Sequence, residues 1–264
     1  MSQMSERCER EDWLELAERA ARLGGEILGE GFGHVGQIGF KSSHMDLVTE
    51  FDRRSEEAIV ELLQRECPEH GLLAEERGSR RGEAEYLWVV DPLDGTMNYA
   101  HAYPLFAVSI ALVRAGRPEV GVVYAPILGE LFTAERGAGA FLNGQRISVS
   151  PTPTLKQSLL GTGFPILEHI EENLPAFRAF LPLAQGIRRD GSAALDLCAV
   201  ACGRFDGFWE LDLKPWDVAA GWLLITEAGG RLSDFGGGTY KLGDRQLLAC
   251  NGRIQRQMIE VLGR

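Results

Sequence analysis

The sequence predicts an α+β fold, and three features of its 264 residues indicate this class. Apolar side chains recur at helical spacing up to about Glu66. Short strand-like runs then follow one another closely up to about residue 150. Beyond that point, helical patterns alternate with short apolar strands, which is typical of an α/β arrangement. We therefore expect an α+β half over residues 1–150 and an α/β half over residues 151–264, packed as one unit.

Two helices are predicted at the start of the chain. The first covers residues 9–30, where one face is formed by Trp13, Leu16, Ala17, Ala20, Leu23 and Ile27. Five glycines from Gly29 to Gly39 then predict a mobile loop, because glycine has the greatest backbone freedom. The second helix is predicted from Asp46 to Glu66, and Pro68 ends it.

The strands of the first half are separated by turns that contain glycine, proline or asparagine. They are predicted at Gly71–Ala74, Tyr86–Val90, Leu105–Val113, Glu119–Tyr124, Leu131–Ala134 and Arg146–Val149. The second half is predicted to alternate between helices and strands. Its helices are Glu168–Phe180, Ser192–Gly203, Pro215–Ala228 and Ile254–Leu262, and its strands are Leu159–Thr162, Gly207–Glu210 and Gln246–Ala249.

Charge and composition exclude several classes of protein. The formal net charge of −11 and the lack of a basic segment disfavour a nucleic-acid binder. No apolar run has the length of a membrane span, and the polar segment from Met1 to Asp12 does not resemble a secretory signal. An odd number of cysteines without a paired spacing fits a reducing cytoplasm. An acidic enzyme is compatible with anionic substrates when its carboxylates hold divalent cations.

The most informative segment is an acidic turn after an apolar strand. Trp88–Val90 leads into Asp91 and Asp94, with Pro92 between them. Pro92 restricts the backbone, and the N–H groups of Gly95 and Thr96 are expected to face a phosphate oxygen. Carboxylates for hard cations thus lie beside donors for an anion, as metal-assisted phosphoryl chemistry requires. A plain acidic turn is the alternative, because Pro-x-Asp-Gly is common turn chemistry.

Three further segments place carboxylates near apolar elements. Asp46 and Asp52 are spaced to share one side of the predicted second helix with Thr49, although Asp46 also suits a helix cap. Glu75 follows the apolar run Leu72–Ala74. Asp217 follows Pro215 and Trp216 at the start of a helix of small residues, where an acidic side chain is stabilised by the helix dipole.

Taken in order, these segments resemble the inositol monophosphatase family from about Lys41 to Gly230. The resemblance rests on Asp46…Asp52, Ala74-Glu75-Glu76, Asp91-Pro92-Leu93-Asp94-Gly95-Thr96, Gly161–Pro165, Gly191–Asp196 and Trp216–Gly221. It implies a layered α-β-α-β-α sandwich, usually a homodimer, with activity that needs Mg²⁺ and is inhibited by Li⁺. It also implies hydrolysis of a phosphate monoester of a small polyol, inositol 1-phosphate above all.

The resemblance also implies a role for each matching residue. One Mg²⁺ would be held by Glu75, Asp91 and the Leu93 carbonyl, a second by Asp91, Asp94 and Asp217, and a weaker third would be steadied by the loop that carries Lys41. The attacking water would be oriented by Glu75 and the Thr96 hydroxyl, which Asp52 would hold. The substrate would contact Asp94, Gly95, Thr96, Ala194, Glu210 and Asp217.

Other interpretations remain open from the sequence. The substrate is alternatively fructose 1,6-bisphosphate, histidinol phosphate or a 3′,5′-nucleotide bisphosphate, because the metal core does not determine the alcohol. A non-catalytic regulatory or binding protein on the same fold is the alternative of another class. Glu210 is alternatively a surface residue paired with Lys214 or Arg204. Arg188 with Arg189 resembles a phosphate clamp, but a surface or dimer-interface role is favoured.

Overall fold

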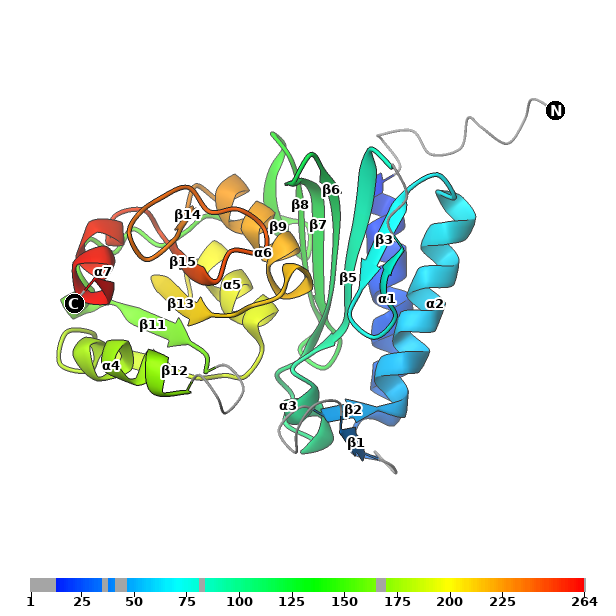
Figure 1. The fold of residues 1–264 in the computed structure, drawn as a ribbon, viewed down its shortest axis with the longest axis horizontal. Helices are drawn as coiled ribbons and strands as arrows, with labels where there is room; N and C mark the ends of the chain where they lie inside the picture. Colours follow the sequence, from blue (N-terminus) through cyan, green and yellow to red (C-terminus); the bar gives the residue numbers. More distant parts are fainter. Residues whose placement is uncertain (1–12, 35–37, 41–46, 81–83, 165–169, 264) are drawn as a thin grey trace.

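The computed structural model of the chain describes residues 13–34, 38–40, 47–80, 84–164 and 170–263, which form five layers (Figure 1). Two N-terminal helices cover one face of an eight-stranded sheet. Two central helices separate this sheet from a five-stranded sheet, and two more helices cover the outer face of the second sheet. The predicted α+β class and the layered α-β-α-β-α sandwich are therefore confirmed.

The first layer consists of α1 (Trp13–Gly31) and α2 (Glu50–Glu66), packed against each other. The predicted loop starts too early, because Gly29 and Gly31 continue α1. At Gly31 a Cβ atom would lie 2.4 Å from the Phe51 ring and from the Tyr99 hydroxyl oxygen. Glycine there serves close packing of the helix rather than loop mobility.

The second helix begins later than the sequence predicts. Leu47–Thr49 forms β2, which pairs with β1 (Ile38–Phe40) in a small antiparallel sheet. Thr49 is the N-cap of α2, and its N–H donates to Asp52 Oδ2 over 2.8 Å, so the two residues form a capping box. Asp46 is therefore not part of this helix, and it lies outside the described residues.

The large sheet has the strand order β10-β9-β8-β7-β6-β5-β3-β4. Its strands are β3 (Gly71–Ala74), β4 (Gly78–Arg80), β5 (Tyr86–Asp94), β6 (Ala107–Arg114), β7 (Arg117–Ala125), β8 (Glu130–Glu135), β9 (Gly139–Leu142) and β10 (Gln145–Arg146). Only β3 and β5 pair in parallel; the other neighbours are antiparallel. The predicted strand over Arg146–Val149 is wrong beyond Arg146, because β10 ends there.

Both faces of this sheet are buried, which explains the continuous apolar runs in its sequence. Along β5, Val89 packs into the core beneath the central helices, whereas Trp88 and Val90 pack under α1 and α2. The middle of β5 is consequently held from two sides. The acidic segment at the end of the same strand therefore starts from a rigid support.

The second half contains the strand order β12-β11-β13-β15-β14. These strands are β11 (Leu159–Thr162), β12 (Gly186–Arg188), β13 (Gly207–Leu211), β14 (Arg231–Ser233) and β15 (Gln246–Cys250). Its helices are a 3₁₀ turn at Leu155–Gln157, α4 (Ile170–Phe180), α5 (Ala193–Ala201), α6 (Pro215–Glu227) and α7 (Gln255–Leu262), and the short helix α3 (Thr96–Ala100) belongs to the first half. Among the described residues, no helix combines the length and the apolar character that crossing a membrane requires.

Candidate active site

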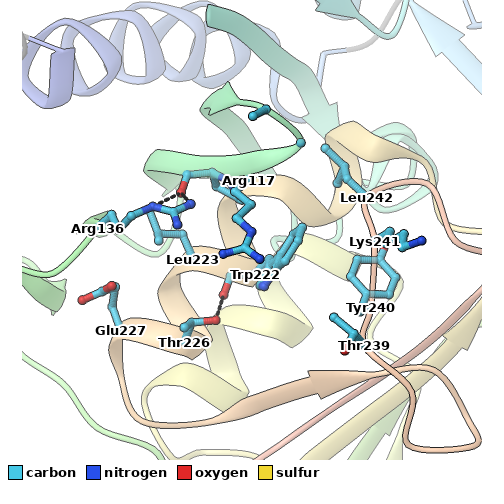
Figure 2. A pocket seen from close by; sticks show the side chains of 13 residues that line it. Arg117, Arg136, Trp222, Leu223, Thr226, Glu227, Thr239, Tyr240, Lys241 and Leu242 are labelled. Carbon is cyan, nitrogen blue, oxygen red and sulfur yellow. Dashed lines mark hydrogen bonds between the residues drawn. The ribbon is translucent and has the colours of Figure 1, made fainter.

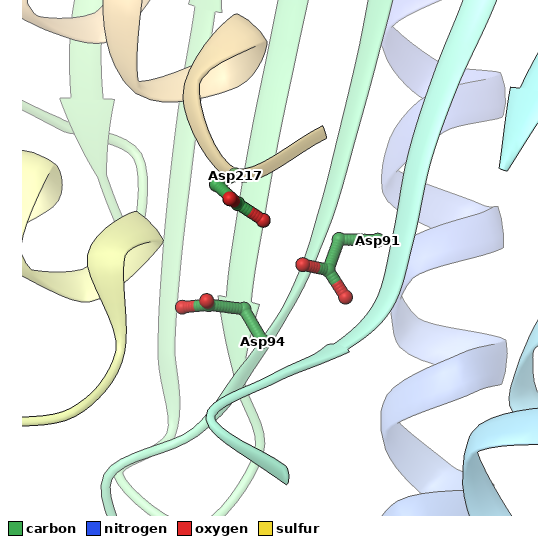
Figure 3. A group of neighbouring side chains, drawn as sticks. All are labelled: Asp91, Asp94 and Asp217. Atoms are coloured by element: carbon green, nitrogen blue, oxygen red, sulfur yellow. The ribbon is translucent and has the colours of Figure 1, made fainter. Parts of the chain in front are cut away.

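Three aspartates converge where β5 ends and α6 begins (Figure 3). Asp91 and Asp94 come from β5 and Asp217 from the first turn of α6, and one carboxylate oxygen of each lies within 4.8 Å of the others. Within the described part of the chain, no other cluster of acidic, histidine or cysteine side chains has this geometry. Hard oxygen donors at this spacing are the ligand type that Mg²⁺ prefers.

A β-bulge brings the first two carboxylates to the same side. In a regular strand, residues three apart point to opposite faces. Asp91 pairs with Ser109 and Asp94 pairs with Ala107, so β5 carries one more residue than β6 across this interval. The extra residue restores a common direction for the two side chains. Pro92 has no N–H to donate to the neighbouring strand. It lies inside the bulge, where a missing strand-to-strand hydrogen bond is tolerated.

Each of the three carboxylates is fixed by hydrogen bonds. Asp91 Oδ1 accepts from the Leu93 N–H over 3.0 Å. Asp94 Oδ2 accepts from the Ser192 hydroxyl and from the Ala194 N–H, the latter over 3.0 Å. Asp217 Oδ2 accepts from the N–H of Lys214, the N-cap residue of α6, over 2.7 Å. The oxygens are thus held in place before any ligand binds.

The close packing of these carboxyl groups raises their pKa values. Burial, followed by the charges of Glu75 and Asp94, raises the pKa of Asp91 well above its usual range. Burial raises the pKa of Asp94 to about 6, although the Ser192 hydrogen bond opposes the shift. Burial and the Asp94 charge raise the pKa of Asp217 to about 8. Neighbouring carboxylates that repel one another are stabilised by a shared cation, so the donor set fits Mg²⁺.

Glu75 lies beside this cluster without belonging to it. It follows β3, and its N–H donates to the Val90 carbonyl over 3.3 Å. Its charge contributes to the raised pKa of Asp91. The Leu93 carbonyl, the other predicted metal ligand, accepts a hydrogen bond from Thr96 Oγ1 over 3.1 Å. Their roles as ligands stay predictions.

The predicted contact between Thr96 and Asp52 is present. Thr96 Oγ1 donates to Asp52 Oδ1 over 3.2 Å, and Asp52 is fully buried. Gly95 precedes α3 with a φ of 91°, and a Cβ atom there would lie 2.9 Å from the Leu105 carbonyl oxygen. Only glycine makes this turn without strain, so the turn that carries Thr96 has a defined shape.

A pocket of about 160 Å³ opens next to the aspartates. Its lining includes Asp94, Asp217, Glu210, Arg189, Ser192 and Asp196. Glu210 is only 9% exposed, and burial followed by the charge of Asp217 raises its pKa to about 8. The interpretation of Glu210 as a surface residue paired with Arg204 is wrong, because Glu210 is buried and Arg204 Nη1 lies 2.7 Å from Glu130 Oε2.

Three residues of this pocket are not among the predicted site residues, and one of them, Arg189, is predicted at a surface or a dimer interface instead. Ser192 anchors Asp94, Asp196 is buried with a pKa that burial raises strongly, and the exposed residue Arg189 lines the pocket. All three lie in or next to the Gly191–Asp196 segment, which was noticed only as a supporting motif. Ala194 is fully buried, and its N–H is used by Asp94. Lys41 lies outside the described residues.

A larger pocket of about 590 Å³, drawn in Figure 2, has none of the three aspartates in its lining. It is bounded by the β6–β7 turn, the C-terminal half of α6 and residues 239–242, with Trp222, Leu223 and Tyr240 among its apolar lining. Arg136 on its wall donates to the Pro118 carbonyl and pairs with Glu119 over 3.2 Å. The larger of these two pockets is therefore not the one that contains the clustered carboxylates.

A buried bulge that presents paired carboxylates beside a polar pocket defines a candidate metal-dependent centre for a small anionic substrate. The sequence profile described as "Inositol monophosphatase family" matches residues 9–263. An inositol-1-monophosphatase of Synechocystis sp. is 45% identical over 254 residues, covering 95% of this chain and 88% of the relative. The Nus factor SuhB of Pseudomonas aeruginosa is 44% identical over 257 residues, covering 94% and 95%.

Solved structures agree with these relatives. The extragenic suppressor protein SuhB of Bartonella henselae superimposes with a TM-score of 0.90 at 41% identity, covering 94% of this chain and 97% of that one. An IMPase/NADP phosphatase, solved in complex with Mg²⁺ and phosphate, is 26% identical with a TM-score of 0.78 and 85% coverage of both chains. The protein belongs to the inositol monophosphatase family.

Proposed function

We propose that the protein hydrolyses the phosphate monoester of a small polyol with Mg²⁺, converting inositol 1-phosphate to inositol and phosphate. The observation that carries the proposal is the convergence of Asp91, Asp94 and Asp217 beside the pocket that contains Glu210. Family membership supports a phosphatase, and the buried Glu210 supports a substrate with hydroxyl groups.

Each acidic residue has a proposed share in binding cations. Asp91 would serve two ions, one together with Glu75 and the Leu93 carbonyl and the other together with Asp94 and Asp217. Mg²⁺ held there lowers the pKa of a water molecule and neutralises charge on the attacking and leaving oxygens. A third, weaker ion would lie near Glu75 and would be steadied by the segment that carries Lys41.

The chain itself would orient the nucleophile. Thr96 donates its proton to Asp52 or to the Leu93 carbonyl, at 3.2 and 3.1 Å, so its oxygen lone pairs are free to accept from a water molecule. Glu75, whose charge acts on Asp91, would accept the other proton of that water. Gly95 and Thr96 would bind the phosphate through their N–H groups.

On the other side of the phosphate, the alcohol would lie in the pocket that contains Glu210. The Glu210 carboxylate would accept hydrogen bonds from substrate hydroxyls, with Asp94, Asp217 and the Ala194 backbone bordering the same space. A carboxylate with a raised pKa gains from such donors, because they replace the water that burial removed.

The remaining properties that the family resemblance implies are part of the proposal. We expect inhibition by Li⁺ that is uncompetitive with substrate, a homodimer, and a cytoplasmic location. Lithium titration at several substrate concentrations tests the first, and sedimentation of the purified protein tests the second.

One assay tests the proposed reaction directly. Phosphate release with Mg²⁺ is measured from inositol 1-phosphate, glycerol 2-phosphate, fructose 1,6-bisphosphate, histidinol phosphate and adenosine 3′,5′-bisphosphate. The highest kcat/KM on inositol 1-phosphate supports the proposal. A clear preference for fructose 1,6-bisphosphate, histidinol phosphate or adenosine 3′,5′-bisphosphate instead identifies that compound as the substrate.

A regulatory function is the second candidate, and a specific observation favours it. Relatives named Nus factor SuhB match this chain about as well as one named inositol-1-monophosphatase, at 44% and 45% identity. Absence of Mg²⁺-dependent phosphate release from every compound of the panel would favour this candidate over the enzyme.

A further inference from the structure

A buried glutamate in the second turn of α2 has no part in the site described so far. Glu56 is only 1% exposed, although glutamate is rarely buried without a partner. Its Oε2 accepts a hydrogen bond from the Glu76 N–H over 2.7 Å. No described residue hydrogen-bonds to Oε1, which lies 3.7 Å from Arg77 Nε. The Glu76 N–H is thus the one hydrogen-bond donor to this carboxylate among the described residues.

That amide belongs to the turn that carries Glu75. The N–H of Glu75 donates to the Val90 carbonyl over 3.3 Å, and the next N–H along the chain donates to Glu56. The peptide groups on both sides of the Glu75 Cα are therefore held, one by β5 and one by α2. Glu75 lies close enough to Asp91 for its charge to raise the pKa of that carboxyl.

The same face of α2 holds two other segments of the site. Ser55 Oγ donates to the Pro92 carbonyl over 3.0 Å, inside the bulge between the two aspartates of β5. Asp52 accepts from Thr96 Oγ1 over 3.2 Å. Residues three and four apart share one face of a helix, so Asp52, Ser55 and Glu56 present a single polar edge to α3, β5 and the turn after β3.

We propose that Glu56 is a positioning residue, which sets the Glu75 carboxylate against Asp91 and thereby determines the affinity for Mg²⁺. The proposal rests on the role of Glu75 under the proposed function. Glu56 acts through the Glu76 amide and touches neither substrate nor metal. Residues that orient metal ligands in this way commonly change affinity or activity by about 10- to 100-fold when they are replaced.

Two conservative variants separate the hydrogen bond from the charge. Glu56→Gln keeps an acceptor of the same reach and loses the charge, whereas Glu56→Asp keeps the charge and is one methylene too short for the Glu76 N–H. Glu57→Asp is the matched control, because Glu57 is the exposed neighbour and contacts the same Arg77, over 3.1 Å. Mg²⁺ binding is measured by calorimetry without substrate, together with the Mg²⁺ dependence of turnover and the melting temperature.

The expected pattern is asymmetric. Glu56→Asp weakens Mg²⁺ binding by about 10- to 100-fold and raises the Mg²⁺ concentration needed for half-maximal turnover in parallel. Glu56→Gln and Glu57→Asp bind Mg²⁺ close to the wild type. KM for the phosphate substrate at saturating Mg²⁺ stays nearly unchanged in all three variants.

Three results overturn the inference. Wild-type Mg²⁺ affinity in Glu56→Asp does so, and so does an equal loss in Glu56→Gln or Glu57→Asp. A lower melting temperature of Glu56→Asp with unchanged Mg²⁺ affinity assigns Glu56 a purely structural role. Calorimetry separates this test from the proposed function: a wild type that binds Mg²⁺ but hydrolyses no compound of the panel refutes the reaction alone. A wild type that binds no Mg²⁺ refutes both.

Discussion

The two groups of carboxylates around the site differ in how they are held. Asp91, Asp94 and Asp217 each accept a hydrogen bond from a nearby backbone N–H, and Asp94 also from Ser192. The carboxylates of Glu210 and Asp196 accept none from the described residues, although both side chains are buried. Fixed oxygens suit a cation that demands a set geometry, whereas unsatisfied oxygens suit a ligand that brings its own donors.

Asp94 and Glu210 show the same contrast in acidity, whereas Asp217, which also accepts a backbone hydrogen bond, has a pKa raised to about 8. Hydrogen bonds from Ser192 and Ala194 oppose the shift of Asp94, so its pKa is raised to about 6. Glu210 has no such donor, and burial raises its pKa to about 8. Under the proposed function, one side of the pocket would hold metal and the other would be left open for substrate.

Replacing the shared aspartate should have the largest effect. Asp91→Asn is expected to reduce Mg²⁺-dependent turnover by about a hundredfold or more, the scale seen when one preorganised charge-stabilising group is lost. The metal-free variant should melt at a higher temperature than the wild type, because one repulsive carboxylate is gone. Turnover near the wild-type value at saturating Mg²⁺ would contradict the assignment of Asp91 as a ligand of two ions.

The next effect concerns the nucleophile. Thr96→Ala should lower kcat by about tenfold to a hundredfold with little change in KM, because water orientation matters mainly in the transition state. Asp52→Asn should act similarly. The double variant should lose less than the product of the two single losses, because Thr96 and Asp52 share one hydrogen bond. Independent, multiplying losses in kinetic assays would instead give Asp52 a separate structural task as the capping partner of Thr49.

The unanchored side of the pocket should respond differently. Glu210→Gln is expected to lower kcat/KM for inositol 1-phosphate by about tenfold to a hundredfold, the scale of a charge-assisted hydrogen bond of about 1.5–3 kcal/mol. Glycerol 2-phosphate, with fewer hydroxyl groups, should lose much less. Equal losses on both substrates would remove the distinction between the two sides of the pocket. Gly163→Ala gives a second check, since its Cβ would lie 2.0 Å from Glu210 Oε1.

The smallest effect is on stability. Asp217 has an ordinary pKa of 3.8 that is raised to about 8 in the folded protein. A carboxylate with a raised pKa favours the folded state at low pH and loses that contribution as the pH rises toward the folded value. The metal-free protein should therefore melt at a lower temperature at about pH 8 than at about pH 5. Mg²⁺ should restore stability mainly at the higher pH; the same increment at both values would argue against binding at these carboxylates.

The sequence predicted the supporting elements better than the details of the site. Helix α6 and strands β3 and β11 follow from local periodicity, so their limits agree with the structure to within a residue. Strand β5 was expected to end at Val90, but it continues to Asp94 through a bulge that exists only because β6 pairs with it. Helix α2 was expected from Asp46, but the chain enters β2 first, and Thr49 caps the helix.

Non-local contacts set the limit of such predictions. The carboxylates were recognisable as a group because a family resemblance links them, not because their spacing along the chain does. The hydrogen bonds from Ser192 and Ala194 to Asp94 join residues about one hundred positions apart, and no local pattern announces them. The same holds for Glu56, whose burial depends on the docking of α2 against the turn after β3.

The bond between Ser192 and Asp94 has a consequence for how the protein is made. A chain emerging from the ribosome carries Asp91 and Asp94 long before it carries Ser192 and Asp217. Under the proposed chemistry, the first half alone would offer only a loose and incomplete chelate. Tight capture of Mg²⁺ would wait until the second half has docked, so the ion would stabilise only finished molecules. Nascent chains, and chains truncated before Asp217, would then lack Mg²⁺-dependent phosphatase activity.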